Sequence, residues 1–211
     1  MNLVLAGPPG SGKGTHAALL AQGRSLRHIS TGELLRGAVA SGSDLGRRVE
    51  GILERGELVP DDLMMAIIRG CLADSGGGWL LDGFPRTVAQ AGALVPLLAE
   101  LNQPVDAVLA LQVPDDEIVR RLAGRLSCGG CGLVTAKDRL GADGGCPRCG
   151  GRDLRVRADD REETVRKRLA VYRAQTQPAL EALGRCYPLR WVDGRGDAAA
   201  VAQRIAGVLE A

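Results

Sequence analysis

The chain has 211 residues, which is enough for one large domain or for one core with insertions. Its 27 basic and 25 acidic residues leave a net charge of +2, so a general polyanion-binding surface is not indicated. No apolar run approaches the roughly 18 residues of a membrane span, and the N-terminus does not have the pattern of a signal peptide. We therefore expect a cytoplasmic protein that binds neither nucleic acid nor membranes.

Short apolar segments alternate with helical stretches along the chain. Strands are predicted at 2–6, 27–29, 78–82, 105–111 and 188–193. Helices are predicted at 13–23, 31–41, 44–55, 61–73, 87–101, 114–124, 160–184 and 197–209. This alternation predicts an α/β fold with a parallel sheet. Between 125 and 158 the periodicity gives way to Gly, Cys, Asp and Arg, which indicates an insertion with its own organisation.

The first predicted strand leads directly into the sequence GPPGSGKGT, residues 7–15. Glycines allow the backbone N–H groups to turn toward phosphate oxygens, and a helix beginning near Lys13 directs its positive dipole end to the same point. Gly14 stands where the Walker pattern has Ser or Thr, so the Mg²⁺ contact would come from Thr15 or through water. The alternative is a glycine-rich turn that only joins a strand to a helix. The predicted phosphate loop comprises Gly10, Ser11, Gly12, Lys13, Gly14 and Thr15.

Two further segments follow predicted strands and should meet this loop at the carboxyl edge of the sheet. They read STGELLR at 30–36 and DGFPR at 82–86. Asp82 ends an apolar strand in the manner of a Walker B acid near Mg²⁺, although a strand-terminal Asp is as often a turn former. Together with Arg86 it suits a transferring phosphoryl group.

Four of the six cysteines form two CxxC pairs, Cys128–Cys131 and Cys146–Cys149, separated by 14 residues. This spacing predicts a closed, structural Zn²⁺ site with four thiolates. A redox dithiol pair and a zinc ribbon that binds nucleic acid remain as alternatives. The segment 126–156 contains no aromatic residue on which bases could stack.

The chain resembles the adenylate kinase family in GPPGSGKGT, STGELLR, GELV at 56–59, DGFPR with Gln90, RLAGR at 121–125, and RADD with VRKRL. The resemblance implies a P-loop kinase core with a five-stranded parallel sheet flanked by helices. It places the core at 1–29, 60–124 and 160–211, a helical AMP-binding insertion at 30–59, and a small zinc-ribbon-like lid at 125–159. It further implies a monomer that transfers the terminal phosphoryl group of MgATP to AMP.

The resemblance also implies a role for individual residues. Those expected at the reacting phosphates are Lys13, Arg86, Arg125, Arg157 and Arg168. Besides the phosphate loop, the residues expected to hold ATP are Arg121, Arg125, Val134, Thr135 and Gly196. Those expected to hold AMP are Thr31, Arg36, Glu57, Leu58, Val59, Gly83, Phe84, Pro85, Arg86, Gln90, Arg157 and Arg168. Mg²⁺ would meet Asp82 through water. Val134, Thr135 and Gly196 depart from the family's usual residues at these positions.

Two alternatives to an adenylate kinase remain at this point. A kinase for UMP, CMP or GMP would differ mainly around the acceptor base, where Thr31 and Gln90 favour AMP. A nucleotide-gated zinc-ribbon protein would have no need of DGFPR or RLAGR. Outside these motifs, His16 is predicted to be a surface helix residue, and Cys71 to be a buried thiol on the apolar side of its helix.

Overall fold

The computed structural model describes residues 1–210 and contains a parallel sheet of five strands. The strands are β1 (Asn2–Ala6), β2 (Arg27–Ser30), β3 (Trp79–Asp82), β4 (Ala107–Gln112) and β8 (Leu189–Asp193), in the order β2-β3-β1-β4-β8. This confirms the predicted α/β fold. Because β1 has neighbours on both sides, the loop that follows it emerges at the centre of the carboxyl edge.

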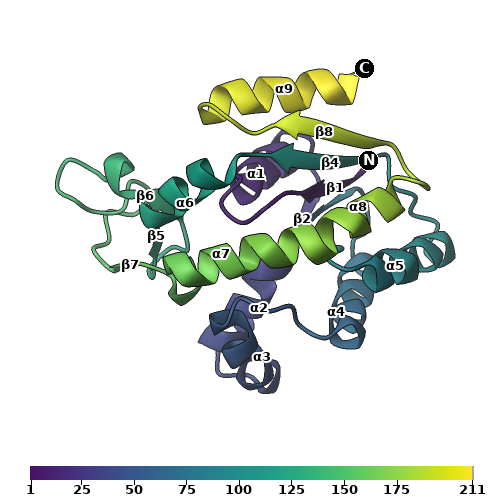
Figure 1. Cartoon of the computed structure of the whole chain (residues 1–211), viewed down its shortest axis with the longest axis horizontal. Helices are drawn as coiled ribbons and strands as arrows, with labels where there is room; N and C mark the ends of the chain where they lie inside the picture. The colour runs from purple at the N-terminus through teal and green to yellow at the C-terminus, as the bar shows by residue number, and fades with distance from the viewer. Residues whose placement is uncertain (211) are drawn as a thin grey trace.

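Helices cover both faces of the sheet (Figure 1). Side chains alternate along β1, so Leu3 and Leu5 pack toward α1 (Lys13–Gly23) and α9 (Ala198–Glu210), whereas Val4 packs on the opposite face. That second face is covered by α4 (Asp61–Ala73), α5 (Val88–Glu100) and α8 (Gln177–Leu183). The sheet is apolar on both faces, as a parallel sheet between two helical layers requires.

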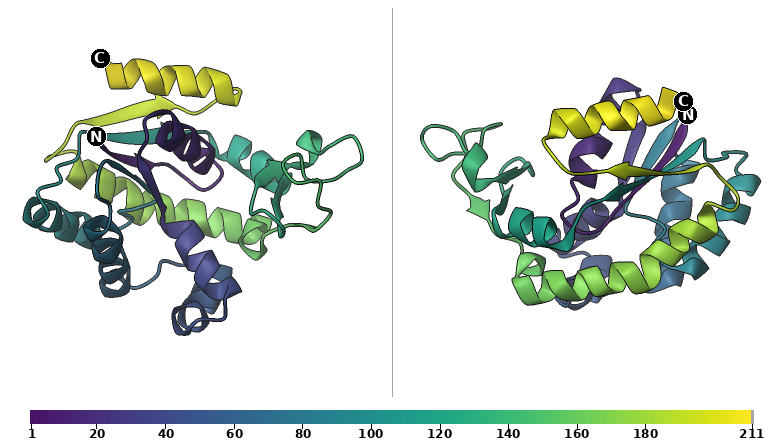
Figure 2. Two further views of the ribbon diagram at one scale, coloured as in Figure 1. Left: turned by 180° about the vertical axis from the view of Figure 1, so that it is seen from behind. Right: turned by 45° about the horizontal axis from the view of Figure 1, so that its top comes forward.

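Two helical segments extend from this core at its carboxyl edge (Figures 1 and 2). The first begins directly after β2 and contains α2 (Thr31–Ala40) and α3 (Asp44–Glu54). The second is the pair α6 (Asp115–Ala123) and α7 (Glu162–Val171), which packs through Ile118, Leu122, Val165 and Leu169. The α6–α7 pair joins the cysteine-containing insertion to the core.

The predicted helix 160–184 is interrupted in the structure. A 3-10 turn (Ala158–Asp160) precedes α7, and a π-helical turn (Tyr172–Thr176) separates α7 from α8. Pro178 follows at the start of α8; it lacks an N–H, so the regular α-helical ladder cannot continue through this point. The wider turn redirects Tyr172 and Thr176 toward the carboxyl edge of the sheet, where both line the cavity described below.

The insertion forms a second, antiparallel sheet of three strands in the order β6-β5-β7. Its strands are β5 (Arg125–Cys128), β6 (Val134–Ala136) and β7 (Leu154–Arg155), with a 3-10 turn at Lys137–Arg139. The buried apolar and thiol side chains in this part are Leu126, Cys128 and Cys146. So small an apolar core is not sufficient to hold an independent domain.

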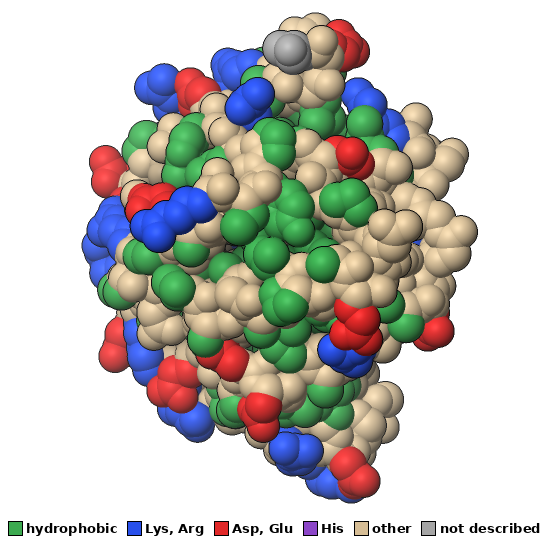
Figure 3. Space-filling model, turned by 90° about the vertical axis from the view of Figure 1, so that its right-hand side faces the viewer, with side chains coloured by type: hydrophobic (Ala, Val, Ile, Leu, Met, Phe, Trp, Pro, Cys, Tyr) green, Lys and Arg blue, Asp and Glu red, His purple; other side chains and the backbone are tan. Residues whose placement is uncertain are grey.

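The side of the molecule opposite the insertion carries α4 and α5. Apolar side chains gather near the centre of this face, and charged side chains lie toward its rim (Figure 3). Arg69 of α4 pairs with Glu100 of α5 there, with 2.7 Å between Nη1 and Oε1. None of the helices in the described part of the chain is both long and apolar enough to cross a membrane.

Candidate active site

The phosphate loop lies between β1 and α1, and Lys13 is the first residue of α1. Gly10 and Gly12 have φ angles of +76° and +90°, a region that side chains with a Cβ rarely adopt. A Cβ at Gly10 would also lie 2.8 Å from Cγ of Leu122, so the loop packs tightly against α6. Lys13 Nζ donates to the carbonyl of Pro8 at 3.3 Å, which folds the lysine back over its own loop.

Asp82 lies beside this loop, at the end of β3. Ser30 Oγ donates to Asp82 Oδ2 at 3.1 Å, and His28 Nε2 is 3.5 Å from the same oxygen. Burial alone would raise the pKa of this carboxyl, but the contact with His28 and the charge of Lys13 lower it below its usual range. A Cβ at Gly14 would come within 3.7 Å of Asp82 Oδ2, so the carboxylate faces the start of α1.

A single cavity opens between the phosphate loop, the α2–α3 segment and the DGFPR turn. Predicted site residues that line it are Lys13, Thr31, Arg36, Glu57, Leu58, Val59, Gly83, Phe84, Pro85, Arg86, Gln90 and Arg168. These positions come from five separate segments of the sequence. The fold therefore brings together every residue expected to hold AMP except Arg157, which lies at the edge of the insertion.

Arg86 is fixed at several atoms in this cavity. Its Nε donates to Gly83 O at 2.7 Å, and its backbone N–H donates to Gln90 Oε1, also at 2.7 Å. Gln90 Nε2 in turn donates to Asp61 Oδ1 at 2.7 Å. Thr176, from the π-helical turn, donates its hydroxyl to the carbonyl of Arg86 at 3.1 Å. Asp61 and Thr176 were not predicted as site residues, because neither lies in a recognisable motif.

Cations crowd around the cavity. Burial, together with the charges of Arg86, Arg168 and Arg125, lowers the pKa of Lys13 to about 7, although the charge of Asp82 acts in the opposite direction. Burial, together with the charge of Arg168, lowers the pKa of Arg86 to about 10. Burial and the charge of Arg36 do the same for Arg157, whose pKa is also about 10. Because these buried cations repel one another, binding of a polyanion would stabilise the site.

Two acids organise the arginines that flank the insertion. The side chain of Asp160 has no exposed surface and binds Arg125 with both oxygens, with a distance of 2.7 Å from Arg125 Nε to Oδ2. Arg168 Nη1 is 2.9 Å from Asp159 Oδ2 and 3.4 Å from Asp160 Oδ1. Arg157 Nε donates to Ser127 Oγ at 2.8 Å. The RADD motif contains both acids, but no sequence pattern indicates that they pair with Arg125 and Arg168.

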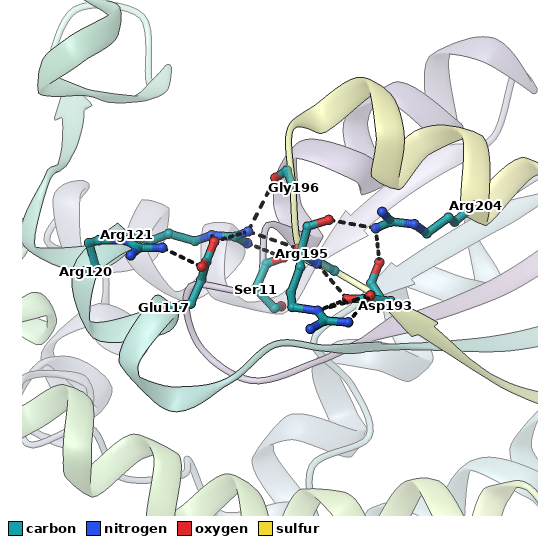
Figure 4. Close-up of polar contacts among 9 residues, drawn as sticks. Ser11, Glu117, Arg120, Arg121, Asp193, Arg195, Gly196 and Arg204 are labelled. Atoms are coloured by element: carbon teal, nitrogen blue, oxygen red, sulfur yellow. Dashed lines mark hydrogen bonds and ion pairs between the residues drawn. The ribbon is translucent and has the colours of Figure 1, made fainter.

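In the region where ATP is expected, Arg121 is surrounded mainly by backbone carbonyl groups (Figure 4). Arg121 Nη2 lies 2.8 Å from Glu117 Oε1 and donates to Gly194 O at 3.0 Å. Longer contacts of 3.5 Å connect the same guanidinium to Ser11 O and Gly196 O. Arg121 therefore joins α6, the phosphate loop and the segment after β8. Val134 and Thr135 lie apart from this group on β6, an edge strand of the smaller sheet.

The four predicted ligands of the metal converge in the insertion. The Sγ atoms of Cys128, Cys131, Cys146 and Cys149 all lie within 4.8 Å of one another. The pairs Cys128–Cys149 and Cys131–Cys146 are each 3.6 Å apart. Backbone N–H groups of Arg148 and Cys149 point at Cys146 and lower its pKa to about 6. These two N–H groups therefore favour the thiolate form of Cys146.

Two predictions outside these motifs need adjustment. His16 is not a surface residue: it is only 4% exposed, because its position on α1 turns toward the phosphate loop, with its ring near Gly12. Burial and the charge of Arg121 lower its pKa. Cys71 is half-buried rather than fully buried, packed at the margin of the core.

The glycine-rich loop after a central strand, the acid on the neighbouring strand and a cation-lined acceptor cavity define a P-loop kinase that acts on nucleotides. Residues 5–185 match the family model described as adenylate kinase. The chain is 44% identical to an adenylate kinase of Thermodesulfovibrio yellowstonii, covering 100% of this chain and 99% of the relative. It is 43% identical to an adenylate kinase of Paracoccus denitrificans, covering 100% and 97%. The chain belongs to the adenylate kinase family and is a phosphotransferase.

Proposed function

We propose that this chain transfers the terminal phosphoryl group of MgATP reversibly to AMP and so gives two ADP. The observation that carries the proposal is the cation set on one cavity, where Lys13 of the phosphate loop shares the lining with Arg36, Arg86 and Arg168. The acceptor phosphate of AMP is already an anion, so the transfer needs no strong general base. Positioning and charge neutralisation carry the catalysis.

Within this scheme the cavity takes AMP. Arg36 and Arg86 bind its phosphate, and Thr31, Leu58, Val59 and Gln90 surround its base. ATP lies on the phosphate loop, with its base against Arg121 and the backbone near Gly196. Lys13, Arg125, Arg157 and Arg168 surround the group in transfer. The AMP-binding segment 30–59 and the lid 125–159 close over the two nucleotides and exclude water.

The residues around Asp82 fit a bound Mg²⁺. Its Oδ1 is buried and has no hydrogen-bond partner among residues 1–210, while the facing position, Gly14, has no side chain to fill the space. Asp82 would hold the ion through water, with Thr15 close by in the loop. When bound, Mg²⁺ neutralises charge on the ATP phosphates. The protein's own part is to keep this carboxylate ionised and aimed at the loop.

The cysteine cluster fits a structural Zn²⁺. A tetrahedral ion with Zn–S bonds of about 2.3 Å requires sulfur atoms roughly 3.8 Å apart, close to the 3.6 Å of the Cys128–Cys149 pair. Four thiolates leave no open coordination position, so the ion would stabilise the lid and take no part in the transfer. We further propose that the enzyme acts as a cytoplasmic monomer.

The test is ADP formation from ATP with AMP, UMP, CMP and GMP as competing acceptors. We expect AMP to be used best, and a faster reaction with UMP or GMP would contradict the proposal. Arg86→Ala should lower kcat by about 10²-fold or more, because it removes a donor to the acceptor phosphate of AMP and so disturbs its alignment for attack. Arg185→Ala, at an exposed position, serves as the control. Equal activity of the two variants would refute the role of Arg86.

A further inference from the structure

The segment that follows β8, residues 193–196, lies directly against the phosphate loop. Gly194 N donates to Gln112 O at 2.8 Å, which continues the pairing of β8 with β4. A Cβ at Gly194 would lie 2.7 Å from Val113 Cγ2 and 3.6 Å from Ser11 O. The backbone of this segment therefore forms one wall of the region over the phosphate loop.

Two guanidinium groups bind four consecutive carbonyls of this segment from opposite sides (Figure 4). Arg121 of α6 donates to Gly194 O at 3.0 Å and to Gly196 O at 3.5 Å. Arg204 of α9 binds the other two carbonyls, since its Nη1 donates to Asp193 O at 2.8 Å and to Arg195 O at 2.6 Å. The carbonyls thus alternate between the two arginines, and both contribute to fixing the path of the backbone.

Arg204 differs from an ordinary solvated arginine. Its position on α9 is exposed, yet its guanidinium is directed at the backbone of the preceding segment. The guanidinium of Arg195 does not compete for these carbonyls, because its Nε and Nη2 donate to the carboxylate of Asp193. Arg204 is therefore the group on α9 that ties this helix to the segment at 193–196.

We propose that Arg204 is a positioning residue for recognition of the donor's purine base. The proposal rests on the proposed function, in which the base of ATP lies against Arg121 and the backbone near Gly196. Gly196 is exposed, and its carbonyl makes one long contact, with Arg121 at 3.5 Å. A carbonyl oxygen has two lone pairs, so this one can accept a further hydrogen bond from a ligand. The exocyclic amino group of adenine can donate to it, whereas guanine presents a carbonyl at that position and is repelled. Arg204 fixes the oxygen at the place where this discrimination occurs.

Arg204→Met tests the proposal, because it keeps an unbranched side chain and removes Nη1, the donor of both hydrogen bonds. Arg204→Lys retains a cationic donor, and Arg190→Met removes an exposed arginine from the same strand that leads into the segment. Calorimetric titration measures ATP and GTP binding without AMP. Steady-state kinetics gives kcat and the KM for each nucleotide, and thermal unfolding checks the fold.

We expect Arg204→Met to weaken ATP binding about tenfold and GTP binding by less, so that the preference for ATP falls. The KM for AMP, kcat at saturation and the unfolding midpoint should stay close to those of Arg190→Met. Arg204→Lys should recover most of the ATP affinity. Equal weakening of ATP and GTP, or an equal rise in KM for AMP, would overturn the proposal, as would behaviour identical to Arg190→Met.

The proposed function is tested separately by the unsubstituted enzyme. If that enzyme forms no ADP from ATP and AMP, the proposed function fails. The binding titrations still decide the role of Arg204 in that case, because they need no turnover. If ADP forms normally and Arg204→Met binds ATP as Arg190→Met does, only the role of Arg204 is refuted.

Discussion

The sheet core and the lid differ in how much apolar surface each one buries. All four residues of β3 are buried, and the core clusters extend through helices on both faces of the sheet. The lid buries Leu126 and two of its cysteines. Hydrophobic burial therefore stabilises the core, whereas the lid has four converging thiols and ion pairs at its base instead of a large apolar core. The lid closure that we propose gains from this independence, because the lid can rearrange without disturbing the core.

The largest effect expected from this contrast is in the core. Leu81→Ala removes a fully buried side chain from β3 and should cost about 2–5 kcal/mol of unfolding free energy through the cavity that it leaves. Denaturant unfolding, followed by the fluorescence of buried Trp79, measures this cost. Leu19→Ala, at a position 50% exposed, should change stability by less than about 0.5 kcal/mol. Equal costs for the two variants would contradict the account of the core.

A substitution in the cysteine cluster should disturb the lid and leave the stability of the core unchanged. Cys131→Ser removes one of four converging thiols, so bound zinc should fall and kcat should drop by about 10²-fold as the lid arginines lose their positions. Unfolding of the core, again followed at Trp79, should stay unchanged. Metal analysis and kinetics provide the measurements, and Cys186→Ser, an exposed thiol outside the cluster, is the control. Full zinc content and full activity in Cys131→Ser would show that the cluster does not hold the lid.

The smallest effect is expected at the junction between the two regions. Asp160→Asn keeps the shape of the side chain but weakens its bonds to Arg125 and Arg168, so kcat should fall about tenfold. Asp153→Asn, which changes an acid paired with Arg155 at the lid surface, should have little effect. Steady-state kinetics of both variants decides the point. A larger loss in Asp153→Asn would mean that lid position depends on surface pairing rather than on the junction.

The sequence predicted those parts of the fold and site that depend on local pattern. The strand, glycine loop and Lys13 lie within a dozen residues, and the phosphate loop follows from them. The two CxxC pairs predicted the cluster of sulfurs that the structure contains. In contrast, the π-helical turn at Tyr172–Thr176 was predicted as ordinary helix, since its α-helical periodicity continues on both sides. His16 was placed on the surface because a single polar residue on a helix does not reveal what packs above it.

By itself, the sequence determined the order of strands and helices, the phosphate loop and the four candidate cysteine ligands. Its motifs also indicated a nucleotide kinase. Tertiary structure alone decided which polar groups meet across the chain. Asp160 meets Arg125 from 35 residues away, Thr176 meets Arg86 from 90, and Arg121 meets Gly194 from 73. The physical reason is that periodicity and spacing encode interactions between near neighbours. These contacts arise only when the parallel sheet and the packing of α6 on α7 bring distant segments together.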